Sequence, residues 1–139
     1  MPITFHPKPG QVLMCDFNTG FRPPEMVKKR LVVVVSRKNR ELATIVPLSS
    51  TAPMPVEPCH HEMQDASLPL SFRGRRTWAK CDMLTTVGYW RLDRVQIGKH
   101  PTTGNRMYVS QVVSPEDLAG IRRAILHVLG LGGLTSAAG

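Results

Sequence analysis

Apolar residues occur along the chain mainly in short runs separated by polar turn residues, a pattern typical of β-strands. The clearest run is Leu31–Val35, whose continuous apolar character predicts a strand buried on both faces. With Leu42–Leu48 it predicts a hairpin across the charged turn Arg37–Glu41. Further strands are expected, in chain order, at Val12–Phe17, at Thr77–Cys81, after Arg91–Ile97, and at Met107–Val113, which pairs with the preceding strand across the turn Pro101–Asn105.

The pattern weakens between residues 51 and 76, where prolines recur. Proline cannot donate to a β-ladder, so we expect mostly irregular structure there. Val56 and the stretch Leu68–Phe72 are candidates for short strands within it.

The last part of the chain has a different periodicity. Ser114 has the side chain of a helix N-cap, Pro115 suits the first helical position, and two acids follow in the first turn. The apolar residues after them recur at roughly helical spacing and make one apolar face, and Gly130 suits the end of the helix. These residues are Leu118, Ile121, Ile125, Val128 and Leu129.

One helix after many short strands predicts a mainly β fold, a small barrel with a C-terminal helix packed against it. The length of 139 residues fits one domain, residues 1–139. We expect residues 1–9 to form an extended arm and residues 131–139 a loose tail. No apolar run approaches the roughly 20 residues that span a bilayer, so no membrane contact is expected.

The balance of charge narrows the class of partner. The chain has 18 Lys and Arg against 10 Asp and Glu, a net charge of +8. Such a surplus of positive charge attracts polyanions, of which nucleic acid is the commonest. The alternatives are an acidic protein partner, or a charge that serves solubility alone and has no partner. Three cysteines at unpatterned spacings and the lack of an apolar signal segment favour a reducing cytoplasm.

Basic residues gather in four clusters at predicted strand ends and loops. A barrel brings loops from one end together, so the clusters can merge into a groove for phosphates, with aromatic residues stacking on unpaired bases. Trp78 and Trp90 can instead be core residues, and for Trp78, inside a predicted strand, the core is expected. The clusters are Lys28–Arg30, Arg37–Arg40, Arg73–Arg76, and Arg91 with Arg94; nearby aromatics are Phe21, Phe72, Trp78, Tyr89 and Trp90. The basic candidates for nucleic-acid binding are Arg22, Lys28, Lys29, Arg73, Arg75 and Arg76.

Several short motifs follow one another in a fixed order. They are Pro9–Val12 opening a strand that ends at Asp16-Phe17, Glu25 and Arg30 before the next strand, Ile45–Ser50, Ala79–Asp82 followed by Thr85–Val87, Arg91-Leu92 through Gly98, and Ser114 into the helix. Through these motifs and their order, the chain resembles the MazF/PemK family of bacterial toxin ribonucleases over roughly residues 8–131.

The resemblance implies an SH3-like barrel, with a helical turn over Thr85–Val87, that forms a homodimer and is neutralised by a cognate antitoxin. It implies cleavage of single-stranded RNA at short sequences without a metal or another cofactor. The 2′-hydroxyl attacks the adjacent phosphate and leaves a 2′,3′-cyclic phosphate and a 5′-hydroxyl. That reaction requires a base, an acid and positive charge at the phosphorane.

By the same resemblance, Arg30 is expected to stabilise the phosphate or to transfer a proton. Ser50 stands where the family usually has threonine and would donate a hydrogen bond to the phosphate, with Ser49 or Thr51 as alternatives. Glu25 would orient Arg30 or act as the base.

Asp82 matches the acid that some members use as the base, and Lys80 falls where those members have arginine. Lysine is a point charge that lacks the planar fork of arginine. Pro24 stands where some members have a histidine. The choice of base between Glu25 and Asp82 stays open.

Other interpretations of these residues are simpler. Glu25 and Arg30 can form a surface ion pair of little consequence, and Asp82 can cap a turn. The run Cys59–Glu62 carries metal-ligand residue types, but adjacent histidines in a strand point to opposite faces, so no metal site is expected.

Two other function classes share the predicted fold. One is a catalytically silent RNA-binding barrel. The other is a gyrase-binding toxin of the CcdB type, which depends on a hydrophobic C-terminal end with tryptophan; this basic chain ends instead in Thr135–Gly139.

Overall fold

Ten short strands and one α-helix make up the fold in the computed structural model, which describes residues 2–134. The strands are β1 (Gln11–Asp16), β2 (Lys29–Ser36), β3 (Leu42–Ser49), β4 (His60–Glu62), β5 (Trp78–Lys80), β6 (Thr85–Gly88), β7 (Leu92–Asp93), β8 (Val95–Lys99), β9 (Arg106–Val109) and β10 (Gln111–Val112). The helix is α1 (Pro115–Val128). The predicted mainly β fold with a C-terminal helix is confirmed.

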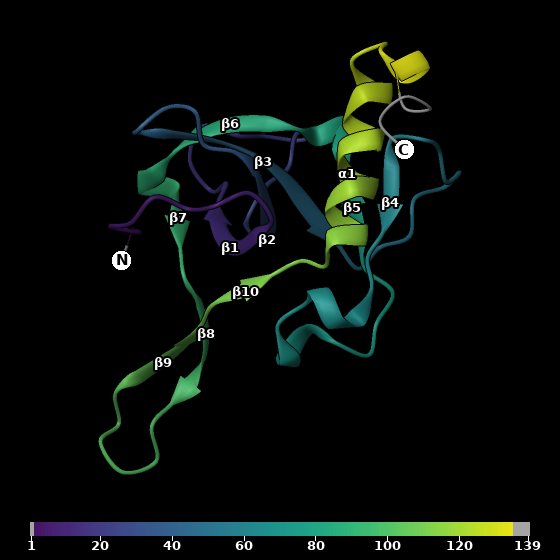
Figure 1. Ribbon diagram of the computed structural model, residues 1–139. Helices are drawn as coiled ribbons and strands as arrows, with labels where there is room; N and C mark the ends of the chain where they lie inside the picture. The colour runs from purple at the N-terminus through teal and green to yellow at the C-terminus, as the bar shows by residue number, and fades with distance from the viewer. Residues whose placement is uncertain (1, 135–139) are drawn as a thin grey trace.

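The main sheet is antiparallel and has the order β10-β1-β2-β3-β5-β4, with β6 also paired to β3 and β7 to β1. The predicted hairpin of Leu31–Val35 with Leu42–Leu48 is present as β2 and β3. The hydrogen-bonded ladder does not close on itself, so the sheet is curved and open where a closed barrel was expected. The strands β8 and β9 form a separate two-stranded hairpin that projects away from the sheet (Figure 1).

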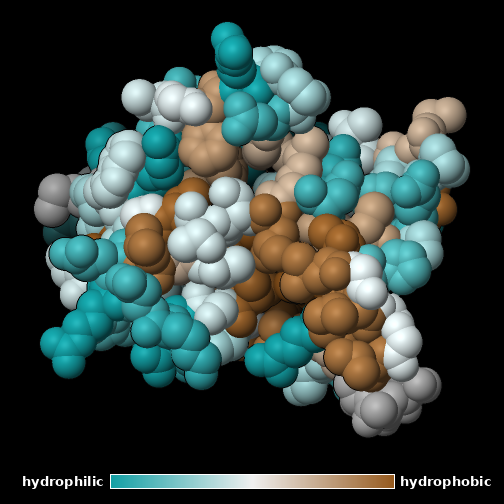
Figure 2. All heavy atoms as spheres, turned by 90° about the horizontal axis from the view of Figure 1, so that it is seen from above, coloured by the Kyte–Doolittle hydropathy of each residue, from teal (hydrophilic) through white to brown (hydrophobic). Residues whose placement is uncertain are grey.

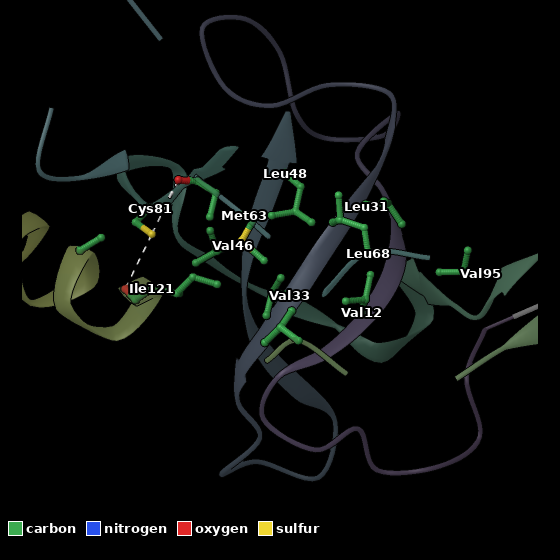
Figure 3. Packing of buried hydrophobic residues seen from close by; sticks show 13 residues of the cluster. Val12, Leu31, Val33, Val46, Leu48, Met63, Leu68, Cys81, Val95 and Ile121 are labelled. Atoms are coloured by element: carbon green, nitrogen blue, oxygen red, sulfur yellow. Dashed lines mark hydrogen bonds between the residues drawn. The ribbon is translucent and has the colours of Figure 1, made fainter. Parts of the chain in front are cut away.

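The alternation of side chains along the central strands produces two apolar layers, one on each face of the sheet. In β2, Leu31 and Val33 belong to the cluster under α1, while Val32 and Val34 belong to the cluster on the other face. This is why Leu31–Val34 is continuously apolar. Figure 3 shows the first cluster, in which the strand residues pack with Ile121 of α1.

The stretch before β1 packs against the second cluster. Ile3 is buried there, and its N–H donates to the carbonyl oxygen of Leu92 at 2.9 Å. The predicted arm is therefore held against the body over the part that the structure describes. Of the predicted tail, residues 132–134 form a 3-10 turn, and residues 135–139 lie outside the described part.

The region between β3 and β5 differs from its prediction. Val56 lies in irregular structure, and Leu70–Phe72 is a 3-10 turn, not a strand. The cause is local: Pro69 offers no N–H to a ladder, and its carbonyl accepts the N–H of Phe72 at 2.8 Å, an i to i+3 bond. The strand described between β3 and β5 is β4 (His60–Glu62), which lies at neither of the two predicted positions.

Two further boundaries also differ. The helical turn expected over Thr85–Val87 occurs earlier, at Cys81–Met83, and Thr85–Gly88 is strand β6. The predicted strand Met107–Val113 divides: β9 pairs with β8 as expected, whereas β10 pairs with β1.

The ends of α1 follow the predicted signals. The Ser114 hydroxyl accepts the N–H of Asp117 at 3.1 Å, as an N-cap does. Gly130, just past the helix, has φ of +75°, a conformation that glycine adopts without strain. Apolar side chains are exposed at this end of the helix and in the turn after it, where Figure 2 shows an apolar patch: Val128, Leu129, Leu131 and Leu134.

Side chains join the two outer strands of the open sheet. Asp117 is almost fully buried at the start of α1, which follows β10, and it accepts hydrogen bonds from β4 and from the chain that follows β4. The donors are the N–H of Gln64 at 2.9 Å, the Ser67 hydroxyl at 2.5 Å and Nε2 of His61 at 2.9 Å. This polar network closes the side of the fold that no ladder closes.

Burial raises the pKa of the Asp117 carboxyl, but the hydrogen bonds from Ser67, His61 and Gln64 outweigh this effect, so the pKa lies below its ordinary value. Asp117 is therefore ionised at neutral pH.

Gly120 in the middle of α1 is required by this network. A Cβ at position 120 would overlap the imidazole of His61. Glycine to alanine in a helix interior ordinarily adds about 1 kcal/mol of stability. Here we expect Gly120→Ala to lower the free energy of unfolding by about 1–3 kcal/mol, the usual cost of overpacking, measured by urea denaturation.

The matched comparison is the same substitution in a His61→Ala background. With the imidazole absent, Gly120→Ala should become stabilising. A stabilising effect in both backgrounds would mean that His61 moves aside without cost.

Candidate nucleic-acid interface

A hollow of about 340 Å³ lies where the start of β2 meets the end of β3. Because β2 and β3 are antiparallel, these two ends share one edge of the sheet. The 3-10 turn Leu70–Phe72 and the chain after it also line the hollow. We call this the cationic hollow; its polar lining is Lys29, Arg30, Ser49, Ser50, Ser71, Arg73, Arg75 and Thr77, and Met14, Leu31, Leu48 and Phe72 complete it.

Arg30 is half-buried in the second position of β2, opposite Cys15 of β1. Its Nε donates to the carbonyl oxygen of Val27 at 3.3 Å, which fixes the guanidinium from behind and leaves its terminal nitrogens for a ligand.

Glu25 does not pair with Arg30 within residues 2–134. Its carboxylate accepts the N–H of Arg22 at 3.4 Å, and its own N–H donates to the Arg22 carbonyl at 2.9 Å. Both residues are exposed in the loop before β2, as is Lys28, and none of the three lines the hollow.

The hydroxyl residues at the end of β3 differ in availability. Ser49 Oγ accepts the N–H of Thr51 at 3.1 Å, so part of its hydrogen-bonding capacity is used in the turn. Ser50 is exposed and lines the hollow. Thr51 lies outside the lining. The serine at position 50 is thus the better-placed free donor.

The Arg73–Arg76 cluster divides. Arg73 and Arg75 line the hollow, and Nε of Arg73 donates to the Leu68 carbonyl at 2.8 Å. Arg76 instead binds both carboxylate oxygens of Glu62, at 2.6 and 2.9 Å, and lies over the Trp78 ring. This pairing raises the pKa of Arg76 and lowers that of Glu62. Trp78 itself is buried, which confirms its predicted place in the core.

Lys80 and Asp82 lie elsewhere. Lys80 is opposite His60 in the pairing of β5 with β4, and neither Lys80 nor Asp82 lines the cationic hollow. Oδ1 of Asp82 is 3.8 Å from Nε2 of His60. The structure therefore separates these two candidates from Arg30 and Ser50.

Cys59, His60 and Asp82 together carry ligand atoms within 4.8 Å of one another, the one such group of three among residues 2–134. The Glu57 N–H donates to Nδ1 of His60 at 3.0 Å, so the neutral imidazole carries its proton on Nε2, toward Asp82. A metal ion bound at Nε2 would displace that proton, and the neutral ring would then carry its proton on Nδ1. A proton on Nδ1 would point at the Glu57 N–H, which is itself a donor, so the arrangement disfavours a metal ion at His60. As predicted, His61 points the other way, to Asp117.

The other two cysteines offer no nucleophile. Burial raises the pKa of the Cys15 thiol to about 12 and that of Cys81 to about 12. Both thiols are therefore protonated at neutral pH and behave as small apolar side chains.

A second hollow, of about 400 Å³, adjoins the first. The two share the lining residues Met14, Lys29 and Phe72. Trp90, Arg91 and Arg94 line the second, which we call the Trp90 hollow. In the sequence these residues stand among the basic clusters and nearby aromatics of a possible groove, but not among the binding candidates. Trp90 and Arg91 lie in the 3-10 turn Tyr89–Arg91.

The fold and this basic hollow define a small β-rich protein with a surface suited to anions. The chain belongs to the family described as PemK-like, MazF-like toxin of type II toxin-antitoxin system, whose model matches residues 8–129.

An uncharacterized protein, YifN, of Escherichia coli (strain K12) is 32% identical, over 91% of this chain and 93% of its own. The fold is similar to that of MazF from Deinococcus radiodurans, with TM-score 0.61, 17% identity, and coverage of 91% and 98% of the two chains. It is also similar to a mycobacterial endoribonuclease in complex with its cognate antitoxin, with TM-score 0.58, 21% identity, and coverage of 90% and 96%.

No helix within residues 2–134 has the length and apolar character needed to cross a membrane.

Proposed function

We propose that the protein is a toxin of a type II toxin-antitoxin system that cuts single-stranded RNA in the cytoplasm without a metal ion. The observation that carries the proposal is the lining of the cationic hollow. Lys29, Arg30, Arg73 and Arg75 converge there, and none of the described residues that line it is a carboxylate. Such a lining suits a phosphodiester, since guanidinium groups bind phosphate oxygens through paired N–H donors.

In this proposal the 2′-hydroxyl attacks the phosphorus atom, the P–O bond to the 5′ oxygen breaks, and a 2′,3′-cyclic phosphate and a 5′-hydroxyl result. Arg30 faces the phosphate and stabilises the charge that develops on its oxygens. Ser50 donates a hydrogen bond to the same group, with Ser49 beside it.

The base is the part of the mechanism that the hollow does not itself supply. Glu25 precedes Arg30 on the loop that leads into β2, and it is our first candidate for the group that takes the 2′ proton. Asp82, with Lys80 nearby on β5, is the second candidate, although both lie outside the hollow in a single chain. A base has to reach hydrogen-bonding distance of the 2′-hydroxyl, so RNA binding or dimer formation would have to bring either one closer.

We further propose that two copies of the chain form the working unit and that an acidic antitoxin segment covers the cationic hollow. The mycobacterial endoribonuclease with a similar fold was solved with its cognate antitoxin. The exposed apolar patch at the end of α1 is the kind of surface that a protein partner covers. Arg22 and Lys28, in the exposed loop before β2, would extend the contact to RNA or to the antitoxin.

The test is incubation of the purified protein with a long single-stranded RNA in EDTA, followed by sequencing of the 5′ ends of the products. We expect fragments with 5′-hydroxyl ends at a short recurrent sequence. Intact RNA at a large excess of folded protein would overturn the proposal.

The second candidate function is an RNA-binding protein without cleavage, which the distance of Lys80 and Asp82 from the hollow favours. It would bind single-stranded RNA with an affinity that falls as salt rises and would give no product.

A further inference from the structure

The two hollows adjoin each other and make a depression with two chemically different parts. Phe72, Lys29 and Met14 line both, so the two lie within reach of neighbouring nucleotides of one strand. A single-stranded nucleic acid presents a phosphate and a base at every step, and the second part of the depression has a lining that suits a base.

Trp90 is the main reason. Its side chain is 61% exposed although it is the largest aromatic residue type, and it lines the second hollow. A tryptophan in a folded protein usually buries its ring against other side chains. An exposed indole beside a cationic hollow is the arrangement with which proteins stack unpaired bases.

The indole is exposed and also held in place. It lies against Gly88, where an added Cβ would come within 2.7 Å of its Cδ1 atom. The guanidinium carbon of Arg91 lies 4.3 Å from the ring centroid of Trp90 and 4.8 Å from that of Phe21. Arg91 is fixed in turn by a hydrogen bond from its Nη1 to the carbonyl oxygen of Asp16 at 3.1 Å. A fixed ring loses little conformational entropy when a base stacks on it.

The charges differ between the two parts. The cationic hollow carries only positive side chains among its charged residues, whereas the Trp90 hollow combines Lys29, Arg91 and Arg94 with Asp16 and Asp93. Carboxylates repel phosphates but are compatible with the uncharged edge of a base. The phosphate therefore belongs in the first part and a base in the second.

We propose that the Trp90 hollow is a subsite for one unpaired nucleobase of single-stranded RNA, stacked on the indole of Trp90, with an adjacent phosphate at Lys29. This subsite deepens the proposed function, since it assumes that RNA is the ligand. It does not depend on cleavage.

The first test measures binding without cleavage. The probe is a single-stranded 2′-O-methyl oligoribonucleotide of mixed sequence, which has no free 2′-hydroxyl to attack the phosphate. In the Trp78→Phe variant, Trp90 is the only tryptophan, and we expect its fluorescence to be quenched as the probe binds. Trp90→Ala should weaken binding about tenfold, from the usual contribution of one stacked base, with Trp90→Phe between the two.

Two variants separate stacking from general damage. Gly88→Ala keeps Trp90 but displaces its ring, so it should also weaken binding, with the melting temperature checked in parallel. Phe5→Ala removes another partly exposed aromatic residue that lines neither hollow, and it should bind like the parent.

The second test identifies the base. A series of probes, each with one abasic position, should contain one position at which the parent loses about tenfold in affinity and Trp90→Ala loses nothing further. Two results would overturn the subsite. One is Trp90 fluorescence that stays unquenched in Trp78→Phe saturated with the probe. The other is an equal loss of affinity in the parent and in Trp90→Ala at every abasic position. Quenching by the probe without any cleavage of RNA would contradict the proposed enzyme activity and support the subsite. Cleavage of RNA, with Trp90→Ala binding the probe as tightly as the parent, would support the enzyme activity and contradict the subsite.

Discussion

Arg30→Ala should lower the single-turnover rate of RNA cleavage in EDTA by at least about a hundredfold, the usual cost of removing one donor that stabilises transition-state charge. The reason is its position in the cationic hollow. Its Nε is engaged by the Val27 carbonyl, and the rest of the guanidinium faces the site where a phosphate would bind. Lys29, Arg73 and Arg75 remain in the variant, so binding of uncleavable RNA should weaken far less than the rate falls.

Arg37→Ala is the matched control. Arg37 lies just beyond the other end of β2, is exposed, and lines neither hollow. The variant therefore removes one positive charge without changing the lining of the site. Its rate should stay within a few-fold of the parent. Arg30→Lys keeps the charge but loses the planar fork, and should recover only part of the activity. If Arg30→Ala and Arg37→Ala reduced the rate equally, Arg30 would act through net charge alone.

The part of the site that lies on the central hairpin could be predicted from the sequence. The apolar run of β2 and its partner β3 define a hairpin, and antiparallel pairing then brings Arg30 close to Ser49 and Ser50. These residues need only a strand register to be placed together, and the hydrophobic pattern specifies that register strongly.

The position of Lys80 and Asp82 could not be predicted in the same way. It depends on β4, a strand of three residues inside a proline-rich segment with no alternation to mark it. Pairing of β4 with β5 places Lys80 opposite His60, and the turn after β5 brings Asp82 near the same histidine. A three-residue strand and a short turn are too brief to leave a periodic signal in the sequence.

The two tryptophans show the same limit of prediction from sequence. Trp78 lies in a strand whose neighbours predict burial, and it is buried. Trp90 lies in a 3-10 turn after Gly88, with its ring against that glycine, and it is exposed. Residue type alone would assign both to the core.

Asp117→Asn should lower the free energy of unfolding by about 2 kcal/mol at pH 7, because hydrogen bonds to a charged group contribute about 1.5–3 kcal/mol. Asp117 is 2% exposed and joins α1 to β4 and the chain after it through three donors, so the lost carboxylate oxygen is shielded from solvent. Asparagine offers one acceptor oxygen and places an N–H₂ group against donors. Urea denaturation of both proteins at pH 7 measures the difference.

Because the pKa of Asp117 is lowered in the folded protein, its contribution is fully present above the unfolded value of 3.8 and is lost as pH falls through the folded value. The gap between the parent and Asp117→Asn should therefore close progressively below about pH 4. Glu116→Gln, at the exposed neighbouring acid in the same helical turn, should change stability by less than about 0.5 kcal/mol. A gap that persisted unchanged in acid would mean that the side chain acts through its shape and not through its charge.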